Sequence, residues 1–125
     1  MFIYPAIIHE EDGVWIDFPD LEGCQTAGET LAETLGLAEE ALGLYIASRI
    51  ENGLELPAPS KLKNIDSGLA QKTYVRTEIE PYLRKTKAVK KMVSLPEWLA
   101  NEAEKKDISL SRTLQEALKA KLHIA

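Results

Sequence analysis

The segment AVKKMVSLPEWL, residues 88–99, changes its hydrophobic period at a proline. Before the proline the residues alternate as they do in a β-strand. The apolar face holds Val89, Val93 and Leu95, and the polar face holds Lys90, Met92 and Ser94. After Pro96 the sequence is typical of the start of a helix. Because a strand of about seven residues can neither pair its backbone nor bury its apolar side alone, its missing partner constrains how the protein folds.

Two short helices are expected after this strand. Trp98, Leu99 and Ala103 give the first helix an apolar side, and Ser109 can cap the second. The second helix carries apolar residues at helical spacing, namely Leu110, Leu114, Ala117, Leu118 and Leu122. A unit of roughly 40 residues is too small to fold alone. We therefore expect residues 84–125 to form a homodimer in which two copies of the strand pair antiparallel above four helices.

Charge is divided unevenly along the sequence. Residues 1–60 hold twelve acidic side chains and one basic one, whereas residues 61–125 hold fourteen basic and eight acidic ones. The net charge of −5 hides this division. Basic residues concentrate just before and within the strand, at Arg84, Lys85, Lys87, Lys90 and Lys91. Such asymmetry indicates a nucleic acid or a charged protein as partner, although a charge run can also be no more than a solvated face.

The strand, the SLP junction and the serine before the second helix resemble the ribbon-helix-helix DNA-binding family over residues 87–122. The resemblance implies a dimer whose two-stranded ribbon reads the major groove of operator DNA. The polar face of the ribbon supplies candidates for base contacts, and the start of the second helix supplies candidates for phosphate contacts. These DNA-binding candidates are Lys90, Lys91, Met92, Ser94, Ser109, Ser111 and Arg112. Lys91 departs from the family pattern, because it falls on the inward face that is usually apolar.

The first half of the sequence predicts a small antiparallel meander. Strands are expected at 2–10, 14–21 and 24–27, with a hairpin turn at Asp12-Gly13 between the first two. In the second strand, Val14, Ile16 and Phe18 alternate with Trp15 and Asp17. The pattern favours an α+β fold.

One long amphipathic helix is expected next. Thr30 and Glu33 form a capping box at its start, and Asn52-Gly53 ends it after about 20 residues. A proline-rich connector, about 54–64, leads to a further strand at 72–80. The expected domains are residues 1–83 and residues 84–125.

The first half resembles the HicB antitoxin family. The shared elements are the YPA start, the FPDLEGC turn, the TAGET start of the helix, and the PAPS segment that follows it. The resemblance implies a partial RNase H-like fold, with a small sheet packed on one long helix. It also implies a partner, the small HicA ribonuclease toxin, which the antitoxin neutralises. Many HicB proteins end in a ribbon-helix-helix module, so the resemblance extends over nearly all 125 residues.

Catalysis and cofactors are not expected. Metal-dependent nucleases need several converging carboxylates, and the acidic residues here do not recur at a spacing that would make them converge. His9 and His123 are isolated, and Cys24 is the only cysteine. A single cysteine allows no internal disulfide and no cysteine-based metal cluster, which fits a reducing cytoplasm. The sequence predicts no enzyme, no cofactor and no metal site.

An acidic first half suits a protein that blocks a ribonuclease, since an RNA-cleaving enzyme has to present a basic surface. The alternative is that the carboxylates serve only solubility. The candidate toxin contacts surround one loop that combines acidity with an aromatic residue: Asp17, Phe18, Asp20 and Glu22.

These observations favour a cytoplasmic antitoxin that neutralises a HicA-like toxin and represses its own operon as a ribbon-helix-helix dimer. The stoichiometry with the toxin stays open. The alternatives are a stand-alone ribbon-helix-helix repressor with a ligand-sensing first domain and, less favoured, a nuclease. The first residues lack a basic segment typical of signal peptides, and no apolar run approaches the roughly 20 residues that span a bilayer. We therefore expect no membrane association.

Overall fold

The computed structural model describes residues 1–124, and the protein divides into two compact units. The N-terminal unit is Met1–Thr86 and the C-terminal unit is Lys87–Ala125. The sequence predicts the division after residue 83. The N-terminal unit extends three residues further because the carboxylate of Glu51 accepts the backbone N–H groups of Arg84 and Lys85.

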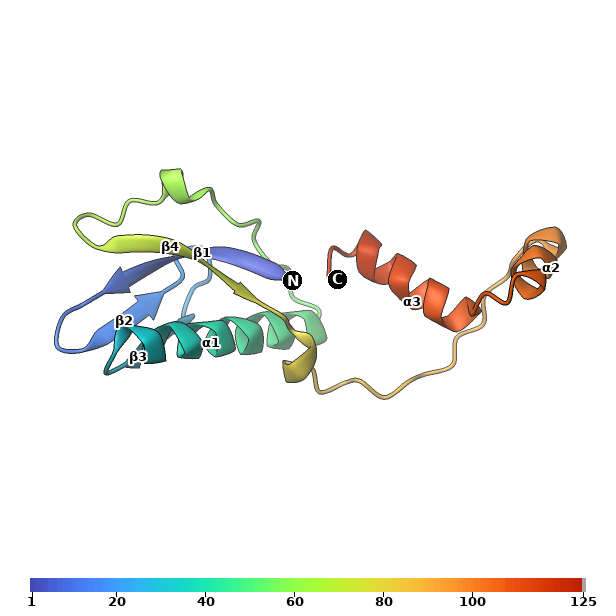
Figure 1. The fold of residues 1–125 in the computed structure, drawn as a ribbon, viewed down its shortest axis with the longest axis horizontal. Helices are drawn as coiled ribbons and strands as arrows, with labels where there is room; N and C mark the ends of the chain where they lie inside the picture. The colour runs from blue at the N-terminus through green and yellow to red at the C-terminus, as the bar shows by residue number, and fades with distance from the viewer. Residues whose placement is uncertain (125) are drawn as a thin grey trace. The chain divides into compact units, whose positions relative to one another are not determined.

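The N-terminal unit is built on a four-stranded antiparallel sheet (Figure 1). Its strands are β1 (Phe2–His9), β2 (Val14–Asp17), β3 (Gln25–Gly28) and β4 (Gln71–Thr77), in the order β3-β2-β1-β4. The predicted hairpin turn is present, with φ of 50° at Asp12 and 106° at Gly13. β2 is shorter than predicted, because the backbone turns at once: the N–H of Leu21 donates to Phe18 O and the N–H of Cys24 to Leu21 O. The alternation predicted for β2 is confirmed, since Val14 and Ile16 are buried and Trp15 is exposed.

One face of the sheet is covered by α1 (Leu31–Glu51). Thr30 caps it as predicted, with its Oγ1 accepting the N–H of Glu33 at 3.2 Å. Ala38, Leu42 and Ile46 are fully buried while Leu31 is exposed, which confirms the predicted amphipathic character of this helix. A side chain at Gly43 would overlap the ring of Tyr82, so this glycine allows α1 to approach η2 (Glu80–Tyr82) closely.

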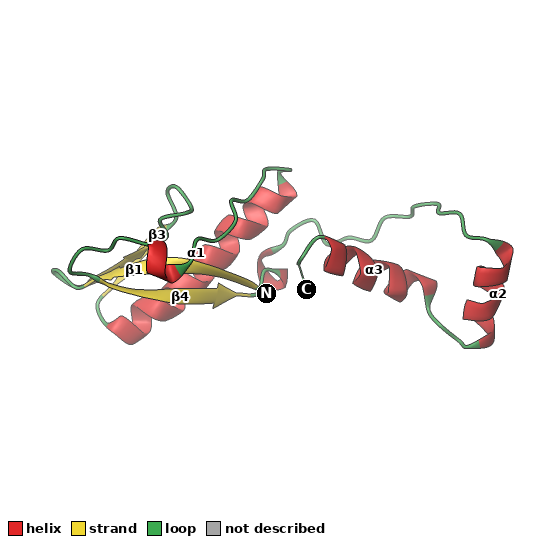
Figure 2. Ribbon diagram, turned by 90° about the horizontal axis from the view of Figure 1, so that it is seen from above, coloured by secondary structure: helices red, strands yellow, loops and turns green. Residues whose placement is uncertain are grey.

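The second face of the sheet is crossed by the connector between α1 and β4, which includes η1 (Leu62–Asn64) (Figure 2). The N–H of Leu62 donates to Tyr74 Oη at 2.7 Å, and Lys72 Nζ donates to Ile65 O at 2.9 Å. Tyr4 Oη donates to Pro57 O at 2.6 Å. The proline-rich segment is therefore a bound strap of the N-terminal unit and not a free linker.

The C-terminal unit contains α2 (Glu97–Lys105) and α3 (Leu110–Lys121). Ser109 caps α3 as predicted, and its Oγ accepts the N–H of Arg112 at 3.2 Å. Pro96 immediately precedes α2, which begins at Glu97. The strand predicted at 89–95 is not formed within a single copy of the protein.

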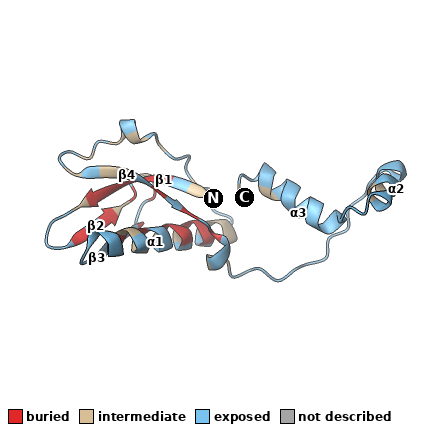
Figure 3. Cartoon of the chain, in the orientation of Figure 1, coloured by how far each residue is buried: buried red, intermediate tan, exposed pale blue. Residues whose placement is uncertain are grey.

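No side chain of α2 or α3 is buried among the residues that the structure describes (Figure 3). The exposed apolar residues of the C-terminal unit include Val93, Leu95, Leu99, Ile108, Leu110, Leu114 and Leu118. A single copy of the protein therefore leaves this unit without a core of its own.

Candidate functional site

The loop predicted to contact a toxin does not form an acidic and aromatic surface. Phe18 is only 2% exposed and belongs to the core, so it offers no aromatic surface to a partner. Asp17 is half-buried, and its Oδ1 lies 2.8 Å from Nε2 of His9 on the neighbouring strand. Both residues thus have structural partners within the N-terminal unit, and the expectation of an aromatic contact surface here is wrong.

The other two residues of that loop differ from each other. Asp20 accepts two hydrogen bonds of 2.7 Å from Ser60, one from the backbone N–H and one from Oγ. This carboxylate therefore fastens the strap to the loop after β2. The side chain of Glu22 is exposed, while its carbonyl accepts a hydrogen bond from Tyr45 Oη at 3.0 Å. Of the four predicted toxin contacts, Glu22 alone is an exposed residue with a carboxylate.

Most carboxylates of residues 1–60 nevertheless face solvent. Four of the twelve make hydrogen bonds within the protein, namely Asp17, Asp20, Glu33 and Glu51. The remaining eight are exposed: Glu10, Glu11, Asp12, Glu22, Glu29, Glu39, Glu40 and Glu55. Over residues 1–86, fifteen acidic and seven basic side chains give the N-terminal unit a net charge of −8, so the unit as a whole is acidic.

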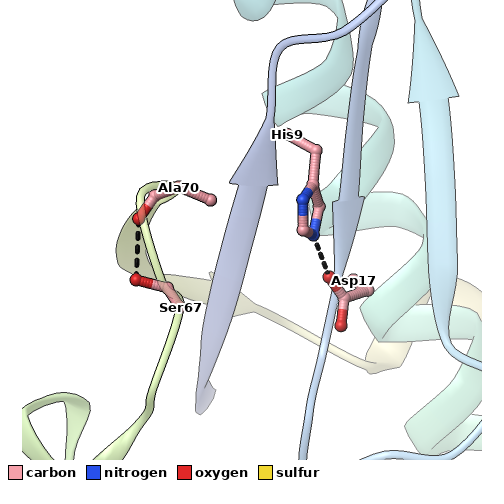
Figure 4. A network of polar contacts seen from close by, with 4 residues as sticks. All are labelled: His9, Asp17, Ser67 and Ala70. Atoms are coloured by element: carbon pink, nitrogen blue, oxygen red, sulfur yellow. Dashed lines mark hydrogen bonds and ion pairs between the residues drawn. The ribbon is translucent and has the colours of Figure 1, made fainter.

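An aromatic pair lies beside the hairpin that joins β1 and β2. His9 and Trp15 are directly opposite each other in the sheet, and their rings stack with centroids 3.7 Å apart at an interplanar angle of 12°. Asp17 fixes the imidazole through a hydrogen bond (Figure 4). The Trp15 side chain is 37% exposed. The sequence pattern places Trp15 away from the core but does not reveal its stack with His9, which depends on the strand register.

A shallow hollow of about 290 Å³ lies next to this pair. Its lining residues are Ile8, His9, Glu10, Glu11, Leu69, Ala70 and Gln71. Leu69 is fully exposed at the tip of a turn that Ser67 closes by donating its Oγ proton to Ala70 O at 2.7 Å (Figure 4). We call Glu10, Glu11, Trp15 and Leu69 the hairpin surface, because they combine two carboxylates with two exposed apolar side chains.

A second hollow, of about 510 Å³, lies between α1 and the loop before β3. Its lining includes Cys24, Leu44, Tyr45, Arg49 and Leu54. Burial raises the pKa of the Cys24 thiol to about 11, so this cysteine stays protonated at neutral pH. No group of three or more His, Cys, Asp or Glu side chains within residues 1–124 is arranged to hold a metal ion.

The predicted DNA-binding residues are all exposed. Lys90, Lys91, Met92 and Ser94 lie in a segment that forms no strand in a single copy. Ser109 and Arg112 lie at the start of α3, joined by the cap, and Ser111 Oγ accepts a hydrogen bond from Gln115 at 3.3 Å.

Among residues 1–124, none of the helices has the length and apolar character needed to cross a bilayer.

The small sheet, the long covering helix and the two following helices make an α+β fold of the kind found in solved structures of bacterial antitoxins. The protein is similar to a chain of a toxin–antitoxin complex from Streptococcus pneumoniae, at 26% identity and a TM-score of 0.62, covering 96% of this chain and 98% of that one. It is also similar to an antitoxin HicB3, at 28% identity and a TM-score of 0.54, covering 96% and 97% of the two chains. The protein belongs to the family of HicB-like antitoxins of bacterial toxin–antitoxin systems, whose profile matches residues 4–121.

Two further relatives match only part of the sequence. A chain of a HicA3 and HicB3 toxin–antitoxin complex is 33% identical at a TM-score of 0.51, covering 61% of this chain and 98% of that one. An uncharacterized 14.9 kDa protein from the rep-hol intergenic region of Haemophilus phage HP1 (strain HP1c1) is 30% identical over 79 residues, which are 62% of this chain. The match spans 59% of that phage protein's own length.

Proposed function

We propose that this protein neutralises a HicA-like, mRNA-cleaving ribonuclease toxin through its N-terminal unit and represses its own operon through its C-terminal unit. Family membership is the observation that carries the first part. It is supported by the similar chains found in solved toxin–antitoxin complexes, one of them described as HicA3 with HicB3. A toxin that cleaves mRNA and operator DNA, the two proposed binding partners, would both be met in the cytoplasm.

Charge supports neutralisation by the N-terminal unit. An enzyme that cleaves RNA binds a polyanion, so its active surface is expected to be basic. The exposed carboxylates of residues 1–60 would attract such a surface and accelerate the encounter. The long-range part of this attraction is screened by salt over roughly 8–10 Å at physiological ionic strength.

Inhibition by the isolated N-terminal unit tests this part of the proposal. Residues 1–86 should inhibit the purified toxin encoded beside this protein, with an association rate that falls as salt concentration rises. The fragment has to extend to residue 86, because β4 lies at Gln71–Thr77 and supplies the edge of the sheet. A folded 1–86 fragment that fails to bind the toxin, while the C-terminal unit binds it, would contradict the assignment.

Operator binding by a dimer is supported by the exposed apolar side chains of the C-terminal unit. A second copy would cover them and would pair the segment around Val93, giving a ribbon that carries Lys90 and Ser94 twice. A two-stranded ribbon fits the major groove of B-DNA. The basic residue Arg84 precedes the ribbon and suits a phosphate contact.

Binding to operator and scrambled duplexes across a salt series tests the DNA-binding part. Lys90→Ala should change the preferred operator sequence, at a cost of about 1–3 kcal/mol for a bidentate base contact. Arg84→Ala should weaken binding to every duplex equally and lower the salt slope by about one for each phosphate that the variant no longer neutralises. If Lys91→Ala changes specificity while Lys90→Ala and Ser94→Ala do not, the opposite face of the strand contacts the bases.

The family match favours this function over a stand-alone repressor that senses a ligand. The two are separated by a single measurement. An antitoxin should co-purify with a small basic ribonuclease encoded beside it, whereas a ligand-sensing repressor should not.

A further inference from the structure

We propose that the toxin docks on the hairpin surface, Glu10, Glu11, Trp15 and Leu69, and that a lysine or arginine of the toxin's RNA-binding face enters the hollow beside it. This inference rests on the proposed neutralisation of a ribonuclease and adds where and how the partner is held. It assigns the contact to the end of the β1–β2 hairpin and the turn before β4. The loop at residues 17–22 is left with a structural role.

The turn that carries Leu69 is ordered by hydrogen bonds and not by burial of Leu69. Ser67 makes two bonds with Ala70, through its Oγ at 2.7 Å and its carbonyl at 3.0 Å, and the N–H of Gly68 donates to Asp66 Oδ1 at 3.0 Å. Gly68 has a φ of +61°, which suits a glycine. A leucine held fully outside the core by an ordered turn gains nothing in the free protein, and a partner that covered it would remove apolar surface from water.

Trp15 is held ready for a partner in a similar way. Its ring lies on His9, and His9 is fixed by Asp17 at 2.8 Å, so the indole is restrained before any partner arrives. Restraint in the free protein lowers the entropy that binding has to remove. Exposed tryptophans in such positions commonly dominate the energy of protein–protein interfaces.

The two carboxylates decide what kind of side chain suits the hollow. Glu10 and Glu11 line it together with Leu69, and Asp12 follows them at the hairpin turn. A long cationic residue can place its apolar stem against the leucine and its charge beside the carboxylates. An arginine could also stack on the exposed aromatic ring of Trp15. A basic ribonuclease supplies side chains of this chemistry on the surface that must be blocked.

The second hollow is a poorer site for the same partner. Arg49 lines it, and the guanidinium donates to Glu55 O at 2.8 and 3.1 Å, so a positive charge already occupies this position. An incoming cation would be repelled there. Leu44 and Leu54 make the hollow apolar, but its charge is of the wrong sign for a basic toxin.

Matched double substitutions test the inference on the full-length protein. Glu10→Gln with Glu11→Gln removes two adjacent exposed carboxylates from the hairpin surface, and Glu39→Gln with Glu40→Gln removes two adjacent exposed carboxylates from α1. Both variants change the net charge equally. A loss of toxin affinity caused only by weaker long-range attraction would therefore be the same for both variants. We expect the hairpin pair to weaken toxin binding on the order of tenfold or more, and the helix pair by less than about threefold.

Leu69→Ser and Leu44→Ser form the matched apolar comparison, because both leucines are exposed and line the two different hollows. Binding to the purified toxin and inhibition of its RNA cleavage should both be impaired by Leu69→Ser and unaffected by Leu44→Ser. If the helix pair and Leu44→Ser weaken binding while the hairpin variants do not, the toxin docks elsewhere and neutralisation still stands. If the unaltered protein binds no toxin, the proposed function fails, and this inference fails with it.

Discussion

The carboxylate of Glu51 accepts the backbone N–H of Arg84 through both oxygens, at 2.9 and 3.0 Å. The two residues are 33 positions apart in the sequence. Glu51 also accepts the N–H of Lys85, and Lys85 Nζ donates to the carbonyl of Glu51 at 3.1 Å. One side chain at the end of α1 therefore fixes where the backbone leaves the N-terminal unit.

This contact should weaken in acid. The hydrogen bonds from Arg84 and Lys85 lower the pKa of Glu51 below its ordinary value. A carboxyl whose pKa is lower in the folded state stabilises the contact above its unfolded pKa, and the stabilisation is lost as pH falls through the folded pKa. Hydrogen–deuterium exchange should show protection of the Arg84 and Lys85 amides at neutral pH, which disappears below the ordinary carboxyl range.

Two controls accompany the exchange measurement. Glu51→Gln should lower the protection of both amides at neutral pH and remove its dependence on acid. The amide of Leu62 donates to a tyrosine hydroxyl at 2.7 Å, so its protection should not follow the titration of Glu51. Equal protection in the unaltered protein and in Glu51→Gln would show that the carboxylate does not hold this segment.

Removing the Asp20 carboxylate should detach the strap. Asp20→Ala leaves the N–H and Oγ of Ser60 without their acceptor, and a hydrogen bond to a charged group contributes about 1.5–3 kcal/mol to the free energy of unfolding. Urea unfolding monitored by Trp15 fluorescence measures this loss, in a Trp98→Phe background that removes the tryptophan of the C-terminal unit. Glu55→Ala, in the same connector, is the control and should stay within about 0.5 kcal/mol. An unchanged midpoint of urea unfolding for Asp20→Ala would show that this carboxylate does not fasten the strap.

Cys24 should resist thiol reagents until the N-terminal unit unfolds. The thiol is buried, and its pKa of about 11 leaves little thiolate at neutral pH. Colorimetric disulfide exchange should therefore be slow in the native protein and rapid in denaturing urea, with one equivalent released because the protein has one cysteine. Rapid labelling of the native protein would show that the loop around Cys24 opens freely.

A charge on the apolar side of α3 should prevent dimerisation. Leu114→Asp places a carboxylate where a second copy would cover the helix, and an unpaired charge is costly to bury. The neighbouring Gln115→Asp carries the same new charge in the same helix and should leave the dimer intact. Sedimentation at micromolar concentration distinguishes the two.

Val93→Pro should have the same effect as Leu114→Asp by a different route, since proline removes a backbone donor from the expected ribbon. Lys87→Pro lies before the ribbon and serves as its control. A unit that is folded and monomeric without any substitution would contradict the dimer.

Periodicity and caps predict the elements that depend on neighbours in the sequence. Thr30, Glu33 and Asn52 mark the ends of α1 where the structure has them, and Asp12-Gly13 forms the hairpin turn. These features depend on contacts between residues a few positions apart, so they can be predicted from one sequence.

Contacts between distant residues could not be predicted in the same way. Asp20 and Ser60 are 40 positions apart, and nothing near Asp20 indicates that its carboxylate is used within the fold. The prediction that Phe18 lies at a binding surface is wrong, because Phe18 is buried in the core. The alternation of Phe18 with Asp17 in the sequence already favours this burial. The strand predicted around Val93 is not formed in a single copy, and on the dimer proposed above its pairing partner is a second copy of the protein.

Residues 87–124 have no core of their own in a single copy, so the folding of the C-terminal unit should depend on the concentration of the protein. On the dimer proposed above, two copies must meet before this unit is stable, so the population of the folded form rises with the square of the free monomer concentration. At low concentration the C-terminal unit would stay unfolded and susceptible to proteases, whereas the N-terminal unit would stay folded around its own core. Neutralisation would then persist at low abundance, and repression would switch on only as the protein accumulates.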